Sequence, residues 1–265
     1  MSEQTEPLNE AQENTAPSQD LQPLAEHLKA LRRVFLVSMI AVFVSSVLCY
    51  GFLREPIMSL VTAPVAEYGI ELKFTSVAEA FMAYMKISIL AGVIFASPIV
   101  LWQILKFVLP GLYASEKKAF LTMLFWLFCL FLAGISFAYF VVLKVALYAL
   151  LFNFSGEFDP FITVANYLSF VGKFLIPFGI VFEIPLLIYF LTKFDLVTPE
   201  SLVKYRRYMI LLIVVIAGVS SPPDVVSQAL LALPMYILFE ISIMISRRVY
   251  KKKLKKAQAA AAMEG

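Results

Sequence analysis

Charged residues are scarce in this 265-residue sequence, in which Asp, Glu, Lys and Arg together make up 15%. A soluble globular domain has about a quarter of its residues charged and about half apolar. Here 61% are hydrophobic and the mean hydropathy is +0.83. The apolar residues form long runs rather than the short alternating runs of a water-soluble core. A soluble globular fold is therefore excluded, and lipid must be the solvent for most of the chain.

Histidine and cysteine are nearly absent, which excludes several kinds of site. The one histidine, His27, lies outside every apolar run, so a serine-type intramembrane protease would lack its base. There is no HExxH pattern for a zinc protease, and no apolar run holds an aspartate for an aspartyl protease. Cys49 and Cys129 sit in separate apolar runs, where they are better explained as buried small side chains than as a disulfide or metal site. We expect no enzymatic activity, cofactor or metal.

Basic residues are missing from residues 1–24, which hold five acidic ones, Glu3, Glu6, Glu10, Glu13 and Asp20, among Ser, Thr, Gln and Pro. This composition is typical of a disordered tail. It is not a signal peptide, which needs a basic start followed directly by an apolar stretch.

Six apolar runs predict six transmembrane helices within a domain spanning residues 25–248. Crossing about 30 Å of hydrocarbon takes roughly 20 helical residues. The runs are 34–53, 80–105, 119–143, 167–191, 208–220 and 225–246. The last two should be short spans joined by a tight Ser-Pro-Pro-Asp turn, because the prolines exclude one continuous helix. Short spans need local bilayer thinning or shelter from neighbouring helices.

The distribution of basic residues predicts the orientation. All but five of the 22 Lys and Arg residues precede the first run or follow the second, fourth and sixth; the exceptions are Arg54, Lys73, Lys86, Lys144 and Lys173. Basic residues remain on the cytoplasmic side. The prediction is an all-α integral protein of the cytoplasmic membrane with six spans, both ends in the cytoplasm, and a basic tail at 249–265. That tail suits contact with anionic headgroups, although it could be a plain stop-transfer anchor.

Glu183 is an intramembrane carboxylate about 12 Å inside the predicted fourth span. Such a group costs a few kcal/mol unless it is protonated, paired or reached by water, so it is a functional candidate. Lys173 lies about 15 Å away along the same helix, too far to pair with it. Pro177 and Pro185 should kink the helix and open a hydrated concave face. The alternative is a structural hydrogen bond from a protonated Glu183 to another span.

Several short strings occur together in one order between Glu26 and Arg248. They are His27-Leu28 and Leu31-Arg32, FVLPGL at 107–112 with Glu116, FAYF at 137–140, YLSF at 167–170, FEIP at 182–185, and SPPDVVSQ at 221–228 followed by PMY at 234–236. In this combination the sequence resembles the TatC family, the multi-spanning subunits of the twin-arginine protein translocase.

The resemblance implies a receptor that binds the twin-arginine signal peptides of folded proteins at the cytoplasmic face. It also implies work with the single-span subunits TatB and TatA in an oligomeric complex, driven by the proton-motive force. No nucleotide, cofactor or nucleic acid is implied.

Recognition of paired arginines requires carboxylates on the cytoplasmic side, since Arg–carboxylate pairs supply geometric specificity. Glu116 is the only acidic residue between the second and third spans, and the resemblance makes it a signal-peptide contact. It could instead cap the following helix or pair with a neighbouring lysine. The resemblance also points to Arg32 and Phe107, which would serve equally as a topology determinant and an interfacial anchor.

The second carboxylate of the family's signal site is replaced by Ala30 in this sequence. Glu26 lies four residues earlier, one helical turn away on the same face. Either Glu26 supplies the missing carboxylate or Glu116 carries more of the recognition alone.

Polar residues near the last predicted turn suit contacts between helices. Ser221 and Gln228 can each contribute an interhelical hydrogen bond worth about 1 kcal/mol, and the resemblance implies that a partner's single helix docks here. Asp224 is expected to cap the sixth helix, and Pro64 to lie in a turn of the first outer loop.

A proton-coupled secondary transporter is the alternative function, with Glu183 as its coupling carboxylate. The absence of a visible internal repeat weighs against it. Failure to export folded proteins in a knockout strain would favour the translocase, and failure to take up a small solute would favour the carrier.

Overall fold

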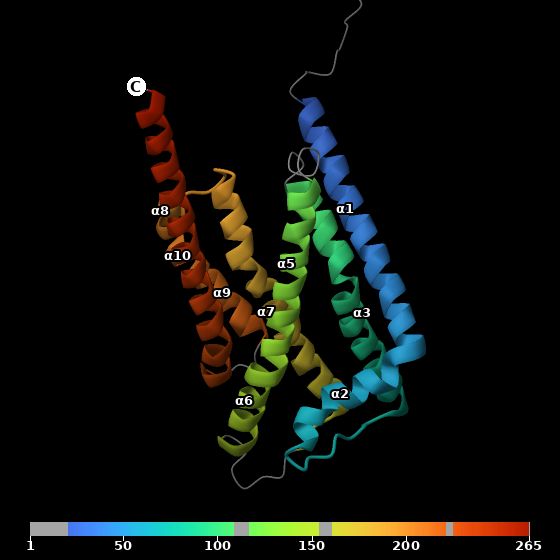
Figure 1. Ribbon diagram of the computed structural model, residues 1–265. Helices are drawn as coiled ribbons and strands as arrows, with labels where there is room; N and C mark the ends of the chain where they lie inside the picture. Colours follow the sequence, from blue (N-terminus) through green and yellow to red (C-terminus); the bar gives the residue numbers. More distant parts are fainter. Residues whose placement is uncertain (1–20, 109–116, 154–160, 221–224, 265) are drawn as a thin grey trace, which may run out of the picture.

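The computed structural model describes residues 21–108, 117–153, 161–220 and 225–264, which are almost entirely helical (Figure 1). The elements in chain order are α1 (Leu21–Leu48), the π-helical turn η1 (Cys49–Leu53), α2 (Arg54–Ala66), α3 (Val77–Val108), α5 (Lys117–Phe137), η2 (Ala138–Val142), α6 (Leu143–Tyr148), η3 (Ala149–Asn153), α7 (Val164–Lys193), α8 (Pro199–Lys204), α9 (Arg206–Ser220) and α10 (Val225–Glu264). The prediction of an all-α membrane protein is confirmed.

Five helical stretches in the described parts of the chain are long and apolar enough to cross a membrane: Leu28–Ala66, Val77–Val108, Lys118–Phe152, Val164–Lys193 and Ser227–Lys255. They correspond to five of the six predicted spans. The remaining one, α9, has 15 residues, about 22 Å of helix. Its role as a span stays a prediction.

The expectation that the last helix is short is wrong. Helix α10 has 40 residues and continues through the predicted boundary at 248 into the basic tail. Lys and Ala favour helix, so the run of charges that ends the apolar segment does not end the helix. Pro234 lies inside α10 without ending it.

Pro64 is a second correction, because it lies inside α2 and is buried rather than in a loop. Proline has no N–H, so the carbonyl of Leu60, four residues earlier, loses its helical partner. The Tyr139 hydroxyl of η2 donates a hydrogen bond to that carbonyl oxygen at 2.6 Å. A partner from another helix thus compensates for the proline.

The helices form a bundle with two distinct ends (Figure 1). At one end lie the start of α1, the end of α3, the start of α5 and the ends of α7 and α10. At the other lie α2, α6 and the starts of α3 and α7; we call it the α2 end. Helix α1 packs along α3, while α7 packs against α3, α5 and α10 and so holds the bundle together.

Small residues let α7 approach α5 closely. A Cβ atom placed on Gly134 of α5 would lie 2.7 Å from the backbone oxygen of Phe178 and 2.9 Å from the Cβ of Phe182. On α7, a Cβ on Gly179 would lie 2.7 Å from the ring of Phe131. Membrane helices associate by close van der Waals packing, which small residues permit. These glycines therefore fix the position of the helix that carries Glu183.

Candidate functional site

Exposed basic side chains gather at the end where α1 starts and α10 ends. We call it the basic end and define it by Arg32, Arg33, Lys106, Lys118, Lys193, Arg247 and Arg248, all exposed. These residues belong to five helices, so the basic end combines segments that are far apart in the sequence. Basic residues that precede the first apolar run or follow alternate runs in the sequence therefore lie together at one end of the bundle.

The residues expected to contact a signal peptide lie at the basic end as far as the structure describes them. Arg32 is exposed on α1, and Phe107 is half-buried in the last turn of α3. Ala30 is exposed on the same helix as Arg32. Glu26 belongs to α1 but its side chain is outside the described residues, and Glu116 lies outside them altogether. The packing of α1 along α3 brings Arg32 and Phe107 to one end.

Glu183 lies in a pocket of about 350 Å³ bounded by α3, α5 and α7. Both of its carboxylate oxygens are buried and make no well-formed hydrogen bond to a described residue, although the backbone of Phe131 on α5 faces them. The other polar side chain in the lining, Ser97, donates its hydroxyl to the carbonyl of Ile94 at 2.7 Å. A buried carboxylate without a partner is costly. This strengthens the case for a functional rather than a packing role of Glu183.

Lys173 is exposed and lines a separate pocket with Tyr167 and Phe170, near the start of α7. It does not meet Glu183, in line with their separation along the helix. Helix α7 changes direction along its length in Figure 1, and it contains both Pro177 and Pro185. Kinks in helices usually occur at proline, so the two prolines account for the bend in α7.

Two tyrosines at the α2 end hold α2 against the bundle, and the sequence analysis did not single them out. Tyr139 donates to Leu60, as described above, and the buried Tyr167 of α7 donates its hydroxyl to the carbonyl of Val61 at 2.7 Å. Both tyrosines lie in the FAYF and YLSF strings. A proline in a helix leaves a carbonyl that another group must satisfy, but the sequence does not show that Tyr139 is that group.

Glu79 is a further residue that the sequence analysis missed. It is 8% exposed, and its carboxylate accepts hydrogen bonds from the backbone N–H of Thr75 at 2.6 Å and of Ala165 at 3.2 Å. Its own N–H donates to the hydroxyl of Ser76. Ser76-x-x-Glu79 is a capping-box pattern, which could have been read from the sequence. Glu79 links the start of α3 to the start of α7.

Of the expected partner-docking residues, Gln228 lies on α10, which pairs with α9 in a hairpin. Ser221 and Asp224 fall outside the described residues. The side-chain nitrogen of Gln228 on α10 donates to the carbonyl of Val214 on α9 at 3.2 Å. The hydrogen-bonding capacity of Gln228 is thus partly used within the hairpin, and its contact with a partner helix stays a prediction.

An ion pair also joins α9 to α10. The Nε of Arg206, at the start of α9, donates to a carboxylate oxygen of Glu240 at 2.6 Å. The two side chains remain 45% and 25% exposed. This pairing could not be predicted from the sequence, because nothing in the pattern shows that residues 34 positions apart meet.

The chain is similar over most of its length to known proteins. Residues 26–234 match the family model described as Sec-independent protein translocase protein (TatC). The TatC protein of Carboxydothermus hydrogenoformans is 44% identical over 232 residues, covering 87% of this chain and 95% of that protein. The TatC protein of Aquifex aeolicus is 38% identical over 235 residues, covering 87% and 97%.

Solved structures of TatC proteins have a fold similar to that of this chain. A crystal structure of the twin-arginine translocase receptor TatC superimposes with a TM-score of 0.78 at 37% identity, covering 84% of this chain and 99% of that one. A second, in DDM, gives 0.76 at 38% identity. A multi-span helical membrane protein with this fold is a component of a protein-transport system. The chain belongs to the TatC family, as the motif strings indicate, and this is a transport family rather than a family of enzymes.

Proposed function

We propose that this protein is the receptor of a twin-arginine translocase and binds the twin-arginine signal peptides of folded proteins at its basic end. The observation that carries the proposal is the meeting of α1 and the end of α3 at that end. It supports the proposal because Glu26 and Arg32 belong to α1, and Glu116 follows the end of α3 in the sequence. Two carboxylates suit a pair of arginines, which bind carboxylates with charge-assisted hydrogen bonds.

The proposal assigns different tasks to the two kinds of residue at this end. Glu116 and Glu26 bind the arginine pair, while Phe107 offers an apolar surface to the residues beside it. Arg32 keeps the start of α1 on the cytoplasmic side. We assign both termini to the cytoplasm of a cytoplasmic-membrane protein and α9 to a sixth, short span.

Glu183 provides a second functional zone within the membrane. An unpaired carboxylate in an apolar pocket is a group that a transport step can use, by changing its protonation or by meeting a polar segment of cargo. We assign the energy source to the proton-motive force. The edge formed by α9 and α10, with Ser221 and Gln228, is assigned to the single helices of TatB and TatA in an oligomeric complex.

Export in a strain that lacks its own receptor tests the proposal. Co-expressed with its TatA and TatB, this chain should restore export of a folded reporter that carries a twin-arginine signal. Glu116→Ala should abolish the restoration and Glu26→Ala should weaken it. Glu200→Ala, at an exposed position of α8, is the matched control and should export normally. Normal export by the Glu116 variant, or a defect in solute uptake instead of export, would contradict the proposal.

A further inference from the structure

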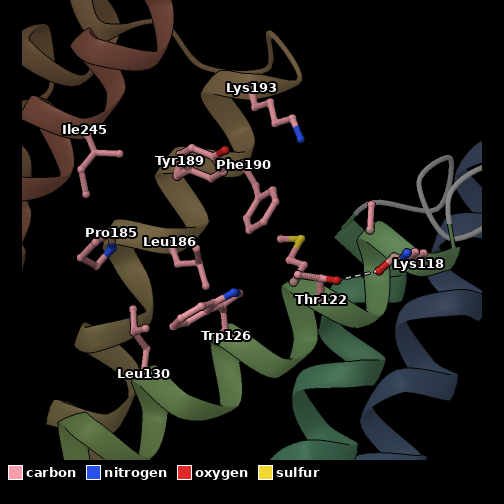
Figure 2. Close-up of a pocket in the computed structure, with 12 residues that line it drawn as sticks. Lys118, Thr122, Trp126, Leu130, Pro185, Leu186, Tyr189, Phe190, Lys193 and Ile245 are labelled. Carbon is pink, nitrogen blue, oxygen red and sulfur yellow. Dashed lines mark hydrogen bonds between the residues drawn. The ribbon is translucent and has the colours of Figure 1, made fainter.

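A groove of about 960 Å³ runs between α5 and α7 and is separate from the Glu183 pocket (Figure 2). On α5 its lining residues recur every four positions: Lys118, Thr122, Trp126 and Leu130. On α7 the same spacing gives Pro185, Tyr189 and Lys193. Residues four apart lie on one helix face. Each helix thus presents one continuous stripe to the groove.

The groove is cationic at one end and apolar below it. Lys118 and Lys193 stand at the basic end, one on each wall, and none of the described residues that line the groove is acidic. Neither lysine forms an ion pair with any other described residue. Beneath them the walls are formed mainly by aromatic and aliphatic side chains, and Figure 2 shows Leu186 and Phe190 of α7 pointing toward α5.

The length of the groove corresponds to one leaflet of a bilayer. Lys118 and Leu130 at the two ends of the α5 stripe are 12 positions apart, about 18 Å of helix. Half of a hydrocarbon core of about 30 Å is roughly 15 Å. Trp126 is 52% exposed, so the wall is accessible from outside the bundle. A charged rim above an apolar channel one leaflet deep has the shape of a site for an amphiphile.

We propose that this groove binds an anionic phospholipid, with the phosphate between Lys118 and Lys193 and an acyl chain lying against Trp126 down to Leu130. The two cations select a ligand of net negative charge, whereas the choline or ethanolamine group of a neutral lipid would be repelled.

Quenching of Trp126 fluorescence by brominated lipid tests this site directly. The chain has two tryptophans, and Trp102→Phe leaves Trp126 as the only reporter. The protein is placed in neutral-lipid nanodiscs that contain the same small fraction of brominated phosphatidylglycerol, cardiolipin or phosphatidylcholine. The anionic lipids should be enriched at Trp126 on the order of tenfold over the neutral one, given the attraction expected of each cation. Stronger enrichment of cardiolipin than of phosphatidylglycerol would identify a ligand with two phosphates. Equal enrichment of these two lipids would identify a ligand with a single phosphate.

Matched variants distinguish lipid binding in this groove from a general electrostatic attraction of anionic lipids to the basic end. Lys118→Gln with Lys193→Gln should remove the enrichment. Lys251→Gln with Lys252→Gln, at exposed positions of α10, removes the same charge and should preserve it. Native mass spectrometry of the chain with both tryptophans intact provides the same comparison if Trp102→Phe disturbs folding. Equal quenching by anionic and neutral lipid, or a preference lost only in the α10 variant, would overturn the proposal.

Discussion

At the scale of single residues, Glu183 is held in place despite the instability that it causes. Its two carboxylate oxygens are buried and make no well-formed hydrogen bond to a described residue, and burial of an unsatisfied polar group costs about 1–3 kcal/mol. The neighbouring Ser97 satisfies its hydroxyl within its own helix, so the pocket can accommodate polar groups without this cost. A destabilising residue at a central position is what a functional requirement produces.

Glu183→Met should therefore stabilise the fold and impair transport. We expect the free energy of unfolding to rise by about 1–3 kcal/mol, measured by denaturation in detergent. Export of a folded reporter should fall roughly tenfold, equivalent to about 1.4 kcal/mol of lost interaction in the transport step. Ser97→Ala in the same pocket is the control and should leave export unchanged. A Met variant that is less stable, or that exports normally, would show that Glu183 has a structural role.

Pro64 and Tyr139 should be coupled energetically. Tyr139→Phe removes the donor to the Leu60 carbonyl, at a cost of about 0.5–1.5 kcal/mol. In Pro64→Ala, the restored N–H can satisfy that carbonyl within α2, so the same tyrosine change should cost much less. A double-mutant cycle on unfolding free energies measures the coupling. If the costs of Tyr139→Phe and Pro64→Ala simply add, the Tyr139 hydroxyl does not compensate for the proline.

The residues that could be predicted from sequence are those whose environment follows from their own helix. Glu183 is one, because its depth in an apolar run alone shows that it is unusual. Tyr139 and Arg206 could not be predicted, since their partners Leu60 and Glu240 lie on other helices. Glu79 stands between the two cases: its capping box is local, but its contact with Ala165 is not.

At the scale of elements, hydrophobic length locates the helices well and their ends poorly. The predicted fourth span, 167–191, lies within α7 (Val164–Lys193). The segment of α2 looks like a loop because it begins with Arg, Glu and Pro, yet it is helical and packs on α3. A prediction that ends the span at the first charged residues cannot show that α10 continues as a helix beyond them. Tertiary contacts and helix propensity, rather than hydropathy, decide these ends.

The contact of α5 with α7 should not tolerate added volume. Gly134→Ala places a methyl group 2.7 Å from the backbone oxygen of Phe178, which cannot yield without moving α7. We expect a loss of about 1–3 kcal/mol in unfolding free energy. Gly51→Ala is the matched control, because a Cβ there meets nothing within 4 Å. If both variants are equally stable, close packing at Gly134 does not fix α7.

At the scale of the whole molecule, the status of α9 decides the topology. If α9 crosses the membrane, Val225 lies outside and Lys251 inside; if it does not, the two positions exchange sides. Val225 is 81% exposed, and the native cysteines Cys49 and Cys129 are free and can be replaced. In spheroplasts, an impermeant maleimide should label Val225→Cys without permeabilisation and Lys251→Cys only after it. The reverse pattern would leave five spans.

The receptor role of the basic end can be tested directly by crosslinking. A photoreactive amino acid at Ala30, four residues after Glu26, or at Val108, the last residue of α3, leaves both proposed carboxylates in place. Both positions should crosslink to a twin-arginine signal peptide, and Glu116→Gln or a twin-lysine peptide should weaken the crosslink. Phe161, 66% exposed at the α2 end, should not crosslink. Crosslinking that does not depend on the arginine pair, or that is as strong from Phe161, would show that the basic end is not the receptor surface.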